Sequence, residues 1–110
     1  MKLAIIGSRN LTQIVIDDYI GQNVTEIVSG GARGVDTLAR EYANRTGKVL
    51  TEFLPRYELY GRAAPLKRNQ EIAEYADELL AFWDGSSRGT AYTIRLFEKS
   101  NKKVTVIIKK

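Results

Sequence analysis

The chain contains no cysteine and no histidine among its 110 residues. A chain without cysteine forms no disulfide and has no thiol chemistry, which favours an intracellular, cytoplasmic protein. A chain without histidine lacks the most frequent metal ligand and the most frequent general base at neutral pH, so zinc sites and Ser-His-Asp triads are excluded. We expect neither a metal nor a cofactor, and binding must use arginine, hydroxyl, amide and carboxylate groups.

Long hydrophobic runs are also missing. No apolar stretch approaches the roughly 20 residues of a membrane-spanning helix, and no basic-then-apolar leader is recognisable. The length allows one hydrophobic core, so we expect a single domain over residues 1–110. The 17 basic and 13 acidic residues give a net charge of +4, which is compatible with an anionic partner.

Short apolar runs alternate with amphipathic segments along the whole chain. The apolar runs predict strands at 3–7, 25–28, 48–55, 78–83 and 103–109. Helices are predicted at 11–20, from 35 to the glycine at 47, at 65–76 and over about ten residues around 91–97. This order predicts a Rossmann-like α/β fold, a doubly wound parallel sheet of about five strands flanked by about four helices.

Two local features depart from this regular pattern. Residues 56–64 show no clear period and predict a loop long enough to cover a ligand. In the helix that follows, Asn69 begins a stripe that continues with Ile72, Ala73 and Ala76. An amide in that place is more often a boundary residue with satisfied hydrogen bonds than a ligand contact, and neighbouring Arg68 is equally compatible with a solvated helix face.

Three predicted strand-to-helix turns share one composition. They read GSRN at 7–10, SGGARGVD at 29–36 and DGSSRGT at 84–90, and each joins glycine and a hydroxyl residue to an arginine. In a parallel sheet such turns emerge at the carboxyl edge, where ligands bind near the point at which the strand order reverses. We therefore expect these turns to lie side by side.

The composition of these turns suits a phosphate group. Glycine turns let backbone N–H groups point at an anion, a following helix adds the positive end of its dipole, and arginine offers paired donors. Neither GxGxxG after the first strand nor GxxxxGK[ST] is present, which excludes an ordinary dinucleotide fold and a P-loop NTPase. For any single turn, a sharp chain reversal with a helix N-cap is the favoured explanation, and the recurrence of three such turns, each with its own arginine, favours a binding site. Asp36 fits a helix-capping role slightly better than a ribose contact.

The sequence resembles a known superfamily. The segments GSR, SGGARGVDTLAREYA, KRNQEIAEYAD and LLAFWDGSSRGT follow one another in the order found in the superfamily that joins DprA (Smf) DNA-processing proteins with cytokinin-activating LOG proteins. The superfamily is abbreviated SLOG, and the chain is most similar to its short, stand-alone YspA-like members. The resemblance covers nearly the whole chain.

The resemblance implies a Rossmann-like domain whose glycine-rich turns bind a nucleotide or a nucleotide-derived ligand. Residues 7–9 match the first-turn motif, and 29–36 are similar to the SGxARGxD of DprA-like proteins. Residues 68–73 are similar to their RNxxIA motif, and 85–90 match the last glycine-rich turn. The assigned nucleotide-binding residues are Gly7, Ser8, Arg9, Ser29, Gly30, Gly31, Arg33, Gly34, Asp36, Arg68, Asn69, Asp84, Gly85, Ser86, Ser87, Arg88, Gly89 and Thr90.

One departure from the superfamily bears on catalysis. LOG-type phosphoribohydrolases carry a PGGxGTxxE motif whose glutamate is implicated in cleaving the N-glycosidic bond, and Thr93 stands at that position here. Hydrolysis would need another carboxylate, and Asp84 and Asp36 are the only ones in the turns. We assign no catalytic residue and keep hydrolysis of a nucleoside monophosphate as an alternative.

The leading hypothesis is a nucleotide-binding domain with a sensor or signalling role. Arg9, Arg33 and Arg88 would hold phosphate, while Asp36 and Asn69 would place the sugar or the base. The other alternative is DprA-like binding of single-stranded nucleic acid, supported by the basic balance and by tyrosines beside basic loops. The resemblance also raises self-association into a homo-oligomer, and no membrane partner is expected.

Overall fold

The computed structural model describes residues 1–109. Five parallel strands form one sheet in the order β3-β2-β1-β4-β5. The strands are β1 (Lys2–Gly7), β2 (Glu26–Ser29), β3 (Val49–Glu52), β4 (Glu78–Trp83) and β5 (Lys103–Ile108). The α-helices are α1 (Val35–Thr46), α2 (Tyr57–Tyr60), α3 (Ala64–Tyr75) and α4 (Arg88–Lys99). The predicted α/β fold with a five-stranded parallel sheet is confirmed.

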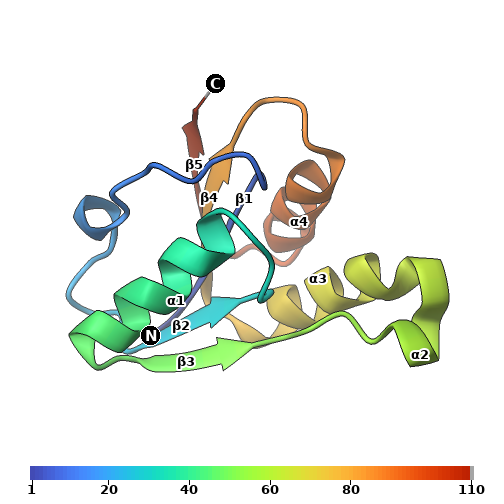
Figure 1. Cartoon of the computed structure of the whole chain (residues 1–110), viewed down its shortest axis with the longest axis horizontal. Helices are drawn as coiled ribbons and strands as arrows, with labels where there is room; N and C mark the ends of the chain where they lie inside the picture. Colours follow the sequence, from blue (N-terminus) through green and yellow to red (C-terminus); the bar gives the residue numbers. More distant parts are fainter. Residues whose placement is uncertain (110) are drawn as a thin grey trace.

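Two hydrophobic clusters hold helices on both faces of the sheet (Figure 1). Successive side chains of a strand point to opposite faces, so neighbouring residues of β1 enter different clusters. The cluster under α1 contains Leu3, Ile5, Ile27, Leu80 and Phe82 of the sheet and Val35, Ala39, Tyr42 and Ala43 of α1. The cluster under α3 and α4 contains Ala4, Ile6, Val28, Leu79 and Ala81 of the sheet and Ile72, Ala73, Ile94 and Phe97 of these helices.

The prediction of a helix at 11–20 is wrong. This connection between β1 and β2 is an irregular loop with a single 3-10 turn at Asp17–Tyr19. Its apolar run 14–16 is β-branched, which lowers helix propensity, and only Ile16 of the run is fully buried, at 2% exposure. Asp17 is bound instead by Arg45 of α1, with 2.7 Å between Oδ2 and Nη1. Packing of Ile16 and its apolar neighbours against the core holds the loop without a helix, and the exposed ion pair adds little.

The segment predicted as a loop at 56–64 contains helical structure. It forms α2 and then a 3-10 turn at Gly61–Ala63, and neither element has a buried residue. Figure 1 shows that this segment projects beyond the end of α3. The absence of an apolar period is therefore explained by exposure of every residue in these two short elements.

The other boundaries agree with the predictions to within a few residues. Strand β4 has the predicted bounds, whereas β3 ends at Glu52, before the predicted end at residue 55. Helix α1 ends at Thr46 and is followed by Gly47, whose φ of 73° is left-handed, as expected for a glycine that caps a helix end. No helix within residues 1–109 has the length and apolar character needed to cross a membrane.

The strand order places the three glycine-rich turns together. β1 lies at the centre of the sheet, between β2 and β4, and all five strands run in the same direction. The turns after these three strands therefore meet at the carboxyl edge. From β1 the chain runs outward through β2 to β3, then crosses back to β4 on the other side of β1 and continues to β5. The strand order therefore reverses at β1, and its carboxyl end is the switch point where ligands bind in such sheets.

Candidate functional site

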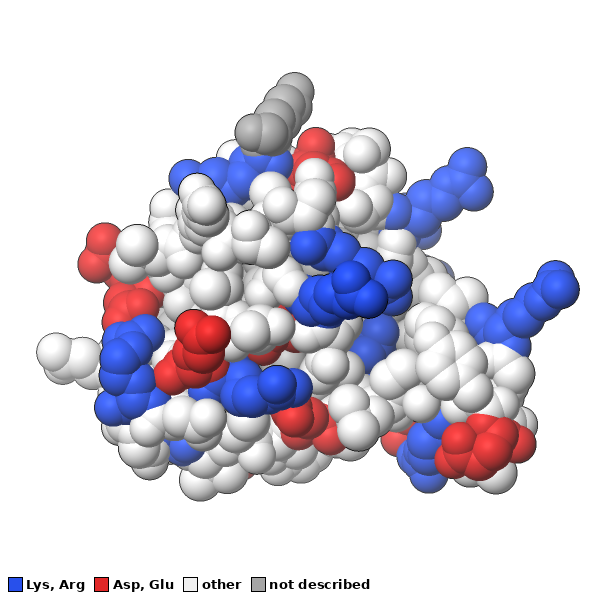
Figure 2. All heavy atoms as spheres, in the orientation of Figure 1, with Lys and Arg blue, Asp and Glu red and all other residues white. Residues whose placement is uncertain are grey.

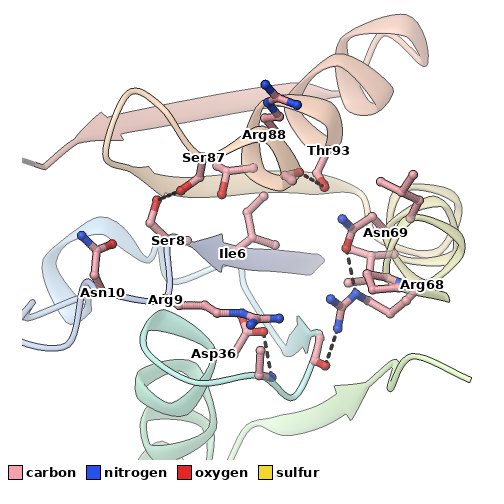
Figure 3. A pocket seen from close by; sticks show the side chains of 18 residues that line it. Ile6, Ser8, Arg9, Asn10, Asp36, Arg68, Asn69, Ser87, Arg88 and Thr93 are labelled. Atoms are coloured by element: carbon pink, nitrogen blue, oxygen red, sulfur yellow. Dashed lines mark hydrogen bonds between the residues drawn. The ribbon is translucent and has the colours of Figure 1, made fainter. Parts of the chain in front are cut away.

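A pocket of about 500 Å³ opens at this edge, between the turns after β1, β2 and β4 and the first half of α3 (Figure 3). Most of the predicted site residues lie in its wall. These are Gly7, Ser8, Arg9, Gly30, Asp36, Arg68, Asn69, Ser87, Arg88, Gly89 and Thr90. The topology thus joins segments that are up to 87 positions apart, from Ile6 to Thr93, around one cavity.

Three arginines and one carboxylate give the pocket its charge. Arg9 follows β1, Arg68 lies on α3 and Arg88 begins α4, while Asp36 is the only acidic residue in the wall. Three positive charges and one negative charge leave the pocket with a net charge of +2. Figure 3 shows the side chains of Arg9 and Arg68 extending toward one another from opposite sides. Figure 2, drawn in the orientation of Figure 1, shows basic side chains gathered near the middle of the face that is in view.

Arg68 spans the distance between α3 and the turn after β2. Its Nη1 donates to the carbonyl oxygen of Gly30 at 2.7 Å, and its Nε donates to Oδ1 of Asn69 at 2.8 Å. A Cβ at position 30 would lie 2.5 Å from Nη1, so only glycine allows this approach. Burial lowers the pKa of Arg68, and the positive charge of Arg9 lowers it further, against the opposing effect of Asp36.

Asp36 is buried in the wall, with 7% of its surface exposed. Its Oδ2 accepts the backbone N–H of Ala32 at 3.0 Å and thereby closes the turn before α1. Burial raises the pKa of this carboxyl, while the Ala32 N–H and the charge of Arg68 oppose that rise. Helix α1 has Gly34 at its N-cap and no side-chain cap hydrogen bond, so Asp36 does not cap the helix. It holds the turn before the helix and also lines the pocket.

The turn between β4 and α4 is organised by Asp84. Its Oδ1 accepts the backbone N–H groups of Ser86 at 2.9 Å and Ser87 at 2.8 Å. The Ser87 hydroxyl lies 3.0 Å from the other carboxylate oxygen and 2.9 Å from the hydroxyl of Ser8. Asp84 itself does not line the pocket. Its carboxylate therefore fixes the turn that carries the pocket residues.

The hydrogen bonds of Asp84 predict an acid-sensitive contribution to stability. The Ser86 and Ser87 N–H groups lower the pKa of Asp84 to about 2. Because the folded-state pKa lies below the ordinary value of 3.8, the stabilisation is present above about pH 4 and is lost as the pH falls toward 2. We expect Asp84→Asn to be less stable than the parent at pH 7 and to lose less of its stability on acidification.

Urea unfolding at pH 7 and near pH 2.5 measures this effect. Asp18→Asn is the matched control, because Asp18 is exposed and has no hydrogen-bond partner in the described part of the chain. An Asp84→Asn variant that loses stability with acid as steeply as the parent would contradict the role given to Asp84.

The first turn of α4 offers unused donors to the pocket. No side chain caps the start of this helix, and the backbone N–H groups of Arg88, Gly89 and Thr90 have no acceptor among residues 1–109. Thr90 in this turn is 7% exposed and lines the pocket. The positive end of a helix with free N–H groups favours an anion.

The remaining predicted residues lie outside the pocket wall. They are Ser29, Gly31, Arg33, Gly34, Asp84, Gly85 and Ser86. Several support the turns: Gly34 has a φ of 71°, and a Cβ there would lie 2.7 Å from the carbonyl oxygen of Arg9. Arg33 is exposed, and its assignment to phosphate stays a prediction.

Some wall residues were not predicted from the sequence. They are Ile6, Asn10, Ala32, Pro65, Leu66, Ile72 and Thr93. Asn10 directly follows the first-turn motif, and Thr93 lies one helical turn after Gly89, whose carbonyl oxygen accepts its hydroxyl at 2.9 Å. Helical spacing from the last turn and sequence adjacency to the first were signals that could have identified these two residues.

The chain was compared with protein-family models, with curated proteins and with solved structures, and nothing matched in any of the three. Among residues 1–109 no group of three or more carboxylates converges on a point that could hold a metal ion. The geometry and charge of the pocket are therefore the basis for a functional assignment.

Proposed function

We propose that the pocket binds a nucleotide or a nucleotide-derived ligand whose phosphate is held by Arg9, Arg68 and Arg88. The observation that carries this proposal is that three arginines, from three separate elements, line one cavity with a single carboxylate in its wall. Guanidinium groups match phosphate oxygens with paired donors, and the free N–H groups at the start of α4 add further donors.

The rest of the wall suits the sugar and base of such a ligand. Its volume of about 500 Å³ falls within the range of small-molecule sites, roughly 300–1,000 Å³. Ile6, Leu66 and Ile72 supply apolar surface, while Asp36 can accept hydrogen bonds from hydroxyl groups with its second carboxylate oxygen. A wall that combines charged and apolar groups suits an amphipathic ligand.

We further propose that the chain belongs to the SLOG superfamily, near its YspA-like members. In support, the GSR turn, the SGxARGxD turn and the RNxxIA helix each contribute residues to one pocket. Thr93, at the position of the LOG glutamate, also lines this pocket. A sensor or signalling role follows from this proposal, because a small domain that binds a nucleotide without a catalytic carboxylate at that position is suited to detecting it.

Single-stranded nucleic acid is the second candidate ligand. It is favoured by Tyr57 and Tyr60, which are 56% and 41% exposed on the segment before α3. Exposed aromatic rings beside a basic pocket can stack with successive bases. The dependence of affinity on salt separates the candidates, because several phosphate contacts along a strand give a steep slope and one mononucleotide gives a shallow slope.

Hydrolysis of a nucleoside monophosphate would have to use Asp36, because the Asp84 carboxylate is occupied by the turn and lies outside the wall. We do not include this reaction in the proposal. Release of free base during prolonged incubation with the protein would establish the reaction, and Asp36→Asn would then test the carboxylate.

Thermal unfolding with a panel of ligands tests the proposal. The panel contains nucleoside monophosphates, diphosphates and triphosphates, nucleotide sugars, cyclic and linear dinucleotides, the free nucleosides and a short single-stranded oligonucleotide. A ligand at 100 times its dissociation constant stabilises a protein by about 2.7 kcal/mol, which raises the melting temperature of a domain this small by several degrees. We expect at least one phosphorylated compound to do so and its nucleoside to have no effect.

Two results would contradict the proposal. Equal stabilisation by a nucleoside and its phosphate would show that the arginines do not hold the phosphate. Stabilisation by the oligonucleotide alone would favour the nucleic-acid candidate.

A further inference from the structure

The guanidinium of Arg68 is held on two of its edges by the protein itself. Asn69 accepts the Nε–H at 2.8 Å through Oδ1, and Gly30 accepts an Nη1–H at 2.7 Å through its carbonyl oxygen. The third nitrogen, Nη2, has no partner among residues 1–109. Two fixed edges define the plane of the group, and Figure 3 shows it facing Arg9 across the pocket.

This arrangement matters because a free arginine side chain samples many rotamers. Ordering those rotamers opposes the binding of an anion, and a guanidinium that is already held loses less entropy for each hydrogen bond it forms. Gly30 supplies one anchor through its backbone carbonyl oxygen. Asn69 supplies the other through its side chain.

Resting on the proposed function, we propose that Asn69 is a positioning residue, which acts on the ligand through Arg68. The sequence hypothesis gave Asn69 a direct contact with sugar or base. The geometry assigns its side-chain oxygen to the Nε–H of Arg68, so that Nη2 is presented to phosphate. This role also explains an amide on a helix stripe that continues with buried Ile72 and Ala73.

The unliganded protein tests the first half of this proposal. In ¹H–¹⁵N NMR spectra at neutral pH, we expect a resolved and slowly exchanging Arg68 Nε–H signal. It should broaden or exchange rapidly in Asn69→Ala and in Asn69→Leu, which keeps the bulk of the side chain. It should persist in Asn69→Asp, which keeps an acceptor oxygen. A signal that is unchanged in both Asn69→Ala and Asn69→Leu would overturn the proposal.

The matched control is Gln70→Ala, on the neighbouring position of α3. Gln70 donates to the hydroxyl of Tyr92 at 2.8 Å and does not line the pocket. Its replacement should leave the Arg68 signal unchanged. Loss of the signal in Gln70→Ala as well would show that the signal reports general loosening of α3 and would count against a specific role of Asn69.

A double-mutant cycle tests the second half. With the nucleotide that stabilises the parent most, Asn69→Ala should weaken binding about tenfold. In an Arg68→Ala background the same change should have less than about a twofold effect, because the group that Asn69 positions is gone. Equal losses in the two backgrounds would show a direct ligand contact and overturn the proposal.

The proposed function and the positioning role fail separately. If no nucleotide binds the parent while the Arg68 signal responds to Asn69 as expected, the nucleotide assignment is wrong and the positioning of Arg68 is supported. If nucleotides bind and the signal does not respond, the nucleotide pocket is supported and the positioning role is wrong.

Discussion

Gly7→Ala should destabilise the fold by about 3 kcal/mol, at the upper end of the range for overpacked cores. A Cβ at position 7 would lie 2.3 Å from Cγ2 of Val35 and 2.8 Å from the carbonyl oxygen of Phe82. Neither neighbour can move easily, because Val35 and Phe82 are both fully buried. In a domain this small the melting temperature should fall by roughly 10–25 °C, which thermal and urea unfolding measure.

A compensating change and a control sharpen this test. Val35→Ala in the Gly7→Ala background should recover part of the loss, since it removes the nearest methyl group but leaves the Phe82 oxygen in place. Gly89→Ala is the control, because a Cβ there meets nothing within 4 Å and the residue lies in α4. It should stabilise by about 0.4–1 kcal/mol. A Gly7→Ala variant as stable as the parent would contradict the close packing of β1 against α1.

Arg68→Ala should weaken nucleotide binding by about 1.5–3 kcal/mol, the range for hydrogen bonds to charged groups. This corresponds to a loss of about 10- to 150-fold in affinity. The change removes the held guanidinium and also leaves the buried carboxylate of Asp36 without the cation that offsets its burial. Isothermal titration with the nucleotide that stabilises the parent most gives the affinity directly.

Two further variants separate charge from geometry at this position. Arg68→Lys keeps the positive charge but replaces the planar guanidinium with a compact ammonium group, which cannot form paired hydrogen bonds to a phosphate. We therefore expect an intermediate loss of affinity. Arg95→Ala removes an arginine from α4 that is exposed and lies outside the pocket wall, and it should leave the affinity within about twofold of the parent. Equal losses in Arg68→Ala and Arg95→Ala would mean that binding depends on overall charge and not on the pocket.

Much of the fold could be predicted from the sequence because the apolar runs are short and well separated. Strand β4 and the end of α1 at Gly47 follow from local pattern and turn chemistry. The connection at 11–20 could not be predicted, because its conformation depends on which of its apolar residues reach the core. Such contacts between distant residues leave no local period.

The position of the pocket could be predicted from the sequence, whereas the arginines that line it could be predicted only in part. Parallel strands bring the turns together whatever the side chains do, and so Arg9 and Arg88 lie where the turn compositions place them. From the sequence we predicted that Arg33 binds phosphate together with Arg9 and Arg88. The third arginine in the pocket wall is instead Arg68. Its reach from α3 depends on the bare backbone of Gly30, which only the folded chain reveals.

The measurement that tests the central proposal most directly is an NMR titration of isotope-labelled protein with the nucleotide that stabilises it most. We expect the largest changes at the backbone amides of Gly30, Arg88, Gly89 and Thr90 and at the Arg68 Nε–H, and little change on β5. Changes centred on β5 or on the amino edge of the sheet, with these signals unmoved, would contradict a nucleotide pocket at the carboxyl edge.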